Sequence, residues 1–274
     1  MSNIPDIGSL AQALVSECGG MLSILSHLSG RIDHELYISE SMAEDPQAAL
    51  NIAYQVVSLL RLRTGCLMNA ASFSDAPWGQ IAVHDSDVYL QDIYELWPPL
   101  WESTPVVTED DLQWVASHLI RNATLSSQPS YALAYRSAAD APYIKDSRTA
   151  VARIWSGIEA LFDVQNELSF RLSMYAAVLV SDNADERISV QAEFKRLYGL
   201  RSKAVHGAKM DEVKLQDTVK SSWSLLRDLL LACLRTGTHV PSPAELDRAL
   251  LGQRLTRNDG AIVAEERSDT GAQQ

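Results

Sequence analysis

The chain has 274 residues, 46% of them hydrophobic, so it can bury a substantial core in one large domain or two small ones. Its apolar runs, such as 175–180 and 229–234, are too short to span a bilayer, and its N-terminus lacks the basic start and apolar stretch of a secretory signal. Three widely spaced cysteines with no C-x-x-C pair indicate small buried side chains in a reducing compartment: Cys18, Cys66 and Cys233. We therefore expect a cytoplasmic protein with no membrane partner.

The N-terminal half predicts helices on either side of an irregular segment. Apolar and small residues at helical spacing predict a helix over ~7–28, and Asp45-Pro46 is typical of the start of a second. The segment 72–106 is rich in proline and tryptophan, and alternation at 81–84 favours a short hairpin within it. Thr108, followed by three acidic residues, caps the start of the next helix.

The C-terminal half predicts an antiparallel helical bundle. Pro129 begins one helix, and apolar stripes predict four more over ~147–163, ~167–181, ~186–206 and ~211–236. A short helix begins at Pro243, and the polar stretch after it is expected to be disordered. The predicted fold class is all-α, with these divisions: a mostly helical N-terminal region over 1–128, a helical bundle over 129–255 and a disordered tail over 256–274.

The helix predicted over ~186–206 ends in two residues that suit phosphate chemistry. Arg201 lies on its apolar stripe, where a guanidinium is costly unless it is paired or faces a wet groove. His206 lies about 140° further round a straight helix, at about 100° per residue. Gly207 is the residue type that ends helices in the left-handed conformation, and unwinding there would let the imidazole swing toward the arginine. A permanent cation beside a group that titrates near neutrality suits phosphate-ester cleavage.

Longer stretches resemble a known family. The sequences RIWSGIEALF (153–162), FRL (170–172) and LYGLRSKAVHG (197–207) are similar to the ApeA-like branch of the HEPN superfamily, whose R-x4–6-H motif is matched by Arg201 and His206. The resemblance covers residues ~129–236. It implies an α-helical, usually dimeric protein that is often a metal-independent endoribonuclease of stress, antiviral or toxin systems. Other members of the superfamily are inactive binding modules.

The resemblance also implies roles for individual residues. His206 would act as general base or acid on the ribose 2′-OH or the leaving 5′-oxygen, and Arg201 would stabilise the phosphorane-like transition state, leaving a 2′,3′-cyclic phosphate. Ser202 is assigned a supporting role beside Arg201. Two motifs facing across the groove of a homodimer would supply both an acid and a base. Some HEPN toxins carry a modified tyrosine two residues after the histidine, but Ala208 stands there in this chain. Control by a regulatory partner protein would need another mode.

Charge argues both for and against RNA as a partner. The net charge of −12 repels polyanions, yet five cations face one acid between Glu193 and Lys209, a local net charge of +4. The predicted RNA-binding residues are Lys195, Arg196, Lys203 and Lys209, although lysines on a solvated helix face would look the same.

Glu159 lies beside the apolar stripe of its helix, and Arg201 is its natural partner. The pair either orients the guanidinium toward a phosphate or simply locks two helices together, with His206 as a capping residue. The rival hypothesis for the whole chain is a non-catalytic helical module that dimerises or binds a nucleotide or a partner protein.

Other chemistries find little support in the sequence. Phosphate-loop, dinucleotide, serine-hydrolase and zinc-protease motifs are absent. His27 and His34 are two helical turns apart, too far for one zinc ion, and His84 with its neighbouring aspartates more often marks a turn. We expect no metal and no cofactor. Three tryptophans could stack bases but more often pack in a core: Trp97, Trp101 and Trp114.

Overall fold

The computed structural model describes residues 35–66, 68, 72–77, 88–90, 106–164 and 168–255, and these parts are mostly helical. The α-helices are α3 (Pro46–Thr64), α4 (Glu109–Ser126), α5 (Pro129–Asp140), α6 (Ser147–Ala160), α7 (Leu168–Val180), α8 (Ala184–Val205), α9 (Glu212–Thr236) and α10 (Pro243–Leu250). A 3-10 turn, η3 (Ala141–Tyr143), follows α5. Strands β1 (Ser72–Ser74) and β2 (Val88–Leu90) form an antiparallel pair in which Phe73 lies opposite Tyr89. The predicted all-α class is confirmed.

Helices begin where side chains can satisfy their first free N–H groups. The Asp45 carboxylate accepts a hydrogen bond from the Ala48 N–H (2.8 Å) at the start of α3, with proline next in the chain. Thr108 and Asp111 form a reciprocal capping box on α4, in which the Thr108 N–H donates to Asp111 Oδ2 (3.0 Å). Both predicted starts are confirmed.

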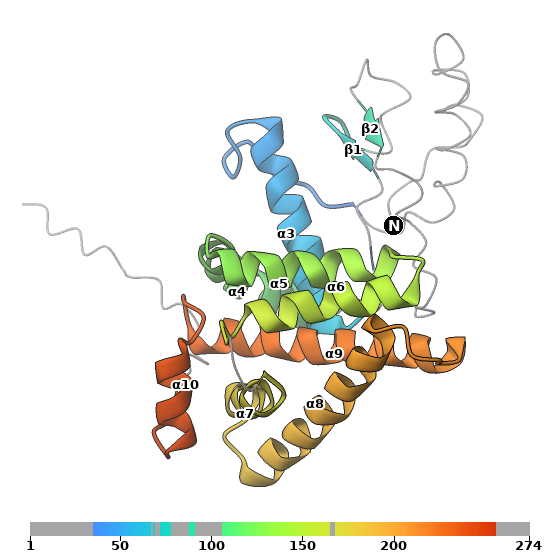
Figure 1. The fold of residues 1–274 in the computed structure, drawn as a ribbon. Coiled ribbons are helices and arrows are strands. Elements are labelled where there is room, and N and C mark those ends of the chain that lie inside the picture. Colours follow the sequence, from blue (N-terminus) through green and yellow to red (C-terminus); the bar gives the residue numbers. More distant parts are fainter. Residues whose placement is uncertain are drawn as a thin grey trace, which may run out of the picture.

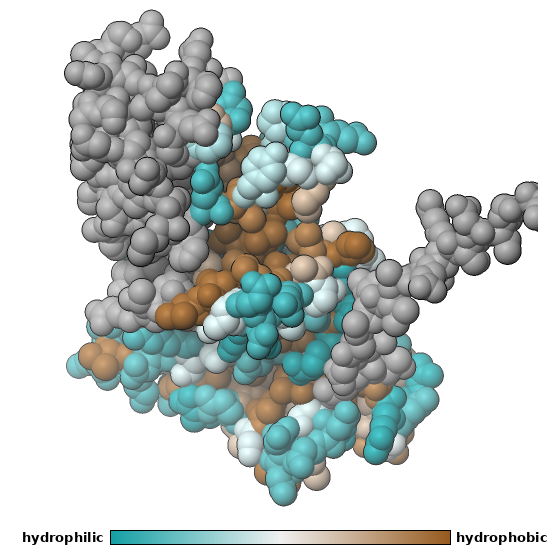
Figure 2. All heavy atoms as spheres, turned by 180° about the vertical axis from the view of Figure 1, so that it is seen from behind, coloured by the Kyte–Doolittle hydropathy of each residue, from teal (hydrophilic) through white to brown (hydrophobic). Residues whose placement is uncertain are grey.

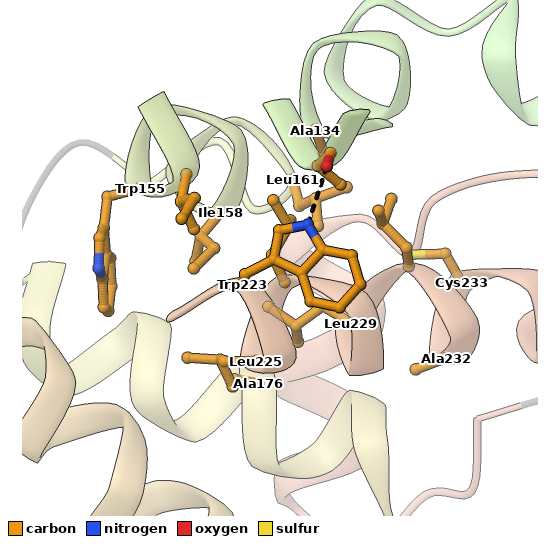
Figure 3. Close-up of a cluster of buried hydrophobic side chains, with 14 of the residues drawn as sticks. Ala134, Trp155, Ile158, Leu161, Ala176, Trp223, Leu225, Leu229, Ala232 and Cys233 are labelled. Atoms are coloured by element: carbon orange, nitrogen blue, oxygen red, sulfur yellow. Dashed lines mark hydrogen bonds between the residues drawn. The ribbon is translucent and has the colours of Figure 1, made fainter. Parts of the chain in front are cut away.

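Helix α9 is the central element. In Figure 1 it runs between α3–α6 on one side and α7 and α8 on the other, and it contacts all six. Helix α7 is viewed nearly end-on while α9 lies across the view, so these two helices cross. The α9 side chain of Trp223 donates to the Ala138 carbonyl (2.8 Å; Figure 3). Ser222 Oγ accepts from Trp155 Nε1 (3.1 Å). Polar indole groups are therefore satisfied inside an apolar core.

One continuous core spans the border predicted between residues 128 and 129. Leu59 of α3 and Leu125 of α4 are fully buried in the same cluster as Trp155 and Leu226 of the later helices. Within the described residues, the helices before and after residue 128 therefore share one hydrophobic core. The helix predicted over ~7–28 and the tail over 256–274 lie outside the described residues, as do residues 81–84 of the predicted hairpin. The described strands β1 and β2, which pair with each other, lie on either side of that stretch in the sequence. No helix among the described residues is long and apolar enough to cross a membrane.

Alanine substitutions at two helical glycines should change the stability of the protein in opposite directions. A Cβ on Gly157 would lie 2.7 Å from Ser137 Cβ and 3.0 Å from Ala134 Cα, because α5 and α6 pack closely there. A Cβ on Gly199 would meet nothing within 4 Å. We expect Gly157→Ala to lower the free energy of unfolding by about 1–3 kcal/mol. Gly199→Ala should raise it by about 0.5–1 kcal/mol, through lower chain entropy in the unfolded state and better helix propensity. Urea denaturation of both variants checks the two signs, and destabilisation by Gly199→Ala would contradict this packing.

The cap of α10 predicts a pH dependence. Hydrogen bonds from the Ser242 hydroxyl and N–H, with a further bond to His239, lower the pKa of Glu245 to about 2. Because the folded pKa is depressed, this stabilisation is complete above the unfolded pKa of 4.5 and is lost as the pH falls through 2. The carboxylate is partly solvent-exposed, so Glu245→Gln should cost only about 1 kcal/mol at pH 7, and nothing once Glu245 is protonated.

The check is the urea midpoint at pH 7 and near pH 2, with Asp217→Asn as the control. Asp217 is an exposed carboxylate of α9 with no hydrogen bond or ion pair to the described residues. An equal cost of Glu245→Gln at both pH values would show that the cap does not depend on charge.

Candidate functional site

Helix α8 carries the Arg201–His206 motif to its C-terminal end. Its N-cap is Asn183, whose side chain accepts from two backbone N–H groups, and the helix continues unbroken through Arg201 to Val205. Gly207 then adopts a left-handed conformation with φ of 74°. The Ala208 N–H donates to the Lys203 carbonyl (2.9 Å) and the Gly207 N–H to the Ala204 carbonyl (3.4 Å), which is a Schellman ending. The role predicted for Gly207 is confirmed, but the last turn does not unwind before it.

Arg201 and Glu159 form the predicted ion pair between α8 and α6. Arg201 Nη2 lies 2.9 Å from Glu159 Oε1, and the two side chains are 22% and 28% exposed. The guanidinium carbon also lies 5.6 Å from the centre of the Tyr198 ring. Glu159 Oε1 and Arg201 Nε are buried without a well-formed hydrogen bond to the described residues, so the pair is held mainly by charge attraction. The guanidinium is half-buried beside the Glu159 carboxylate.

Arg148, near the start of α6, holds the turn that carries His206. Its Nη1 donates to the Ala204 carbonyl (2.6 Å) and its Nη2 to the Ala208 carbonyl (2.8 Å). No motif or apolar pattern in the sequence pointed to this residue. One signal was present: an arginine in the first turn of a helix opposes the helix dipole, so it needs another partner to offset that cost.

Three acidic residues lie at the starts of α6 and α9: Asp146, Asp211 and Glu212. Ser147 Oγ donates to Glu212 Oε1 (2.6 Å), which ties the start of α9 to the start of α6. Asp146 and Asp211 cap these two helices. The local excess of positive charge in the sequence is therefore reduced in space, because these acids lie beside the turn at His206.

The two motif residues belong to α8 and its end, and the segments that carry them contact opposite ends of α6. Arg201 contacts Glu159 near its C-terminal end, whereas the turn with His206 contacts Arg148 near its N-terminal end. Arg148 and Glu159 are separated by about 16 Å along the helix axis at 1.5 Å per residue. The His206 side chain is exposed and makes no hydrogen bond or ion pair with the described residues. Within the described part of the chain, the guanidinium is paired with Glu159 and not with the His206 imidazole.

The predicted RNA-binding residues differ in their surroundings. Arg196 is held by Glu193 through two hydrogen bonds of 2.6 Å, which lower the pKa of Glu193. The Lys195 ammonium lies 5.7 Å from the centre of the Phe170 ring. Lys203 and Lys209 are exposed at the end of α8, so these two cations lie close to His206 in the chain.

The remaining candidates that lie within the described residues give no second site. Ser202 is half-buried, and its carbonyl accepts from the His206 N–H (3.1 Å). Trp114 stacks on His118 with ring centres 4.2 Å apart and packs against the core, as predicted for a structural tryptophan. Among the described residues, no group of histidine, cysteine or acidic side chains is arranged to bind a metal ion. Five other candidates lie outside the described residues: Trp97, Trp101, His27, His34 and His84.

Comparison with known proteins places this chain in no family. No family model matches it, and neither does any curated protein or solved structure.

Proposed function

We propose that this chain is a metal-independent endoribonuclease of the HEPN type that acts as a homodimer. The observation that carries the proposal is an exposed imidazole on a well-formed helix end, His206, on the same helix as an arginine that a carboxylate orients. Lys203 and Lys209 add positive charge beside the imidazole, where a phosphodiester would approach. The resemblance to the HEPN superfamily supplies the reaction class and a role in antiviral defence or a toxin-like stress response.

The proposed reaction is a transesterification. One His206 removes the proton from a ribose 2′-OH, and the 2′-oxygen bonds to phosphorus while the bond to the 5′-oxygen breaks. The protonated His206 of the second copy gives its proton to that leaving oxygen. Arg201 stabilises the charge that develops on the non-bridging oxygens. A dimer fits this scheme because a single chain has one motif histidine, which cannot easily act as acid and base at once.

The test is incubation of single-stranded RNA with the purified chain in the presence of a chelator. We expect fragments that end in a 2′,3′-cyclic phosphate and begin with a 5′-hydroxyl, produced by a species that light scattering identifies as a dimer. Cleavage that stops in chelator, or full activity from a monomer at tens of micromolar, would contradict the proposal.

A helical interaction module is the second candidate, and one observation favours it. Large hydrophobic side chains are exposed on and beside α3 and α4: Tyr54, Val106, Leu112 and Ile120. Figure 2 shows hydrophobic surface gathered toward the middle of one face and around α3, while the lower part of that face is mostly hydrophilic. A chain that binds a partner protein there and cleaves no RNA would support this alternative.

A further inference from the structure

Four arginines share one task in the described part of the chain: each donates to a main-chain carbonyl in the last turn of another helix. Arg121 bonds to Leu234 of α9 (2.7 Å) and Arg235 to Val180 of α7 (3.1 Å). Arg227 bonds to Leu62 (2.6 Å) and Arg63 (3.0 Å) at the end of α3. Arg148 bonds to the carbonyls of Ala204 and Ala208 at the end of α8. Carbonyls at a helix end have few donors within the helix, so these guanidinium groups add hydrogen bonds and positive charge where the helix dipole favours them.

Arg148 differs from the other three arginines because its two acceptors flank a motif residue. Its two acceptors, the carbonyls of Ala204 and Ala208, lie on either side of His206 in the chain. The planar guanidinium therefore fixes the main chain before and after the imidazole relative to α6. Inside the turn, the His206 N–H donates to the Ser202 carbonyl (3.1 Å). Helix ends without such support fray easily.

We propose that Arg148 is a positioning residue for His206. The inference rests on the proposed ribonuclease function and deepens it. Proton transfer requires an imidazole nitrogen within hydrogen-bond reach of the ribose hydroxyl. The His206 side chain has no partner among the described residues, so its placement depends on the main chain of the turn. Arg148 acts on the reaction by holding that main chain, without touching RNA.

Arg227 provides a matched control, because it makes the same two-carbonyl contact at the end of α3, away from the motif. Arg148→Ala and Arg227→Ala should lower the urea midpoint by similar amounts. Arg148→Ala should also lower kcat for RNA cleavage about 10–100-fold with KM changed less than about threefold, since misplacement of a catalytic group affects the chemical step. Arg227→Ala should leave kcat within about twofold. Arg148→Lys should recover part of kcat, because an ammonium can reach one carbonyl but not both in a planar fork.

Amide hydrogen exchange separates this inference from the proposed function. Arg148→Ala should accelerate exchange at the amides of His206 and Ala208 at least tenfold, whether or not the protein cleaves RNA. If the wild type cleaves no RNA, the proposed function fails, and the catalytic role of Arg148 fails with it. If the wild type cleaves RNA but Arg148→Ala matches Arg227→Ala in kcat, or leaves those amides protected, Arg148 is a structural residue and the inference is overturned.

Discussion

His206→Ala should abolish RNA cleavage while leaving the stability of the protein almost unchanged. In the proposed reaction the imidazole of each copy moves a proton, and loss of a general acid–base group reduces the rate by about 10²–10⁴-fold. The side chain is exposed and makes no hydrogen bond or ion pair with the described residues, so the free energy of unfolding should change by less than about 0.5 kcal/mol. The measurements are kcat on single-stranded RNA and a urea denaturation curve.

The control is Lys203→Ala, which removes an exposed cation of the same turn without touching the proposed proton transfer. It should weaken RNA binding, raise KM and leave kcat nearly unchanged, with a lower sensitivity to salt. If His206→Ala retains cleavage and changes only stability, His206 is a helix-capping residue and the motif is structural.

Arg201→Ala should remove activity and also destabilise the fold. Loss of a group that stabilises the transition-state charge costs about 10²–10³-fold in kcat. The variant also leaves Glu159 half-buried without its cation. The pair is neither fully buried nor exposed, so we expect the free energy of unfolding to fall by about 1–3 kcal/mol, between the values for surface and buried ion pairs.

Two further variants separate the structural and catalytic shares of Arg201. Arg201→Lys keeps the charge opposite Glu159 and should restore stability more than activity, because an ammonium cannot present a planar fork to phosphate oxygens. In Arg201→Ala/Glu159→Gln the orphaned carboxylate is gone, so stability should recover in part while cleavage stays absent. Recovery of cleavage in that double variant would show that Arg201 is a structural partner of Glu159 and not a catalytic residue.

The helices and the Glu159–Arg201 pair could be predicted from local features of the sequence. Caps such as Asp45 and Thr108 act within one turn, and a charged residue on an apolar stripe requires an opposite charge, which Glu159 offers beside the stripe of its own helix. The contacts of Arg148 could not be predicted, because its acceptors are main-chain carbonyls 56 and 60 residues away, and every residue has one. The shared core was missed for a similar reason, because α3 and α4 join the bundle through contacts with α9 that are distant in sequence.

The central position of α9 has a consequence during synthesis on the ribosome. Chains emerge from their N-terminus, and α9 follows, in sequence, the described helices α3 to α8, each of which packs on it. Until residues 212–236 have emerged, the apolar stripes of α3 to α8 that face α9 lack that partner, and exposed apolar surface of this kind makes a nascent chain prone to aggregate. The turn with His206 directly precedes α9, whose Glu212 accepts a hydrogen bond from Ser147 at the start of α6. A chain that stalls before α9 therefore lacks the helix on which α6 and α8 both pack.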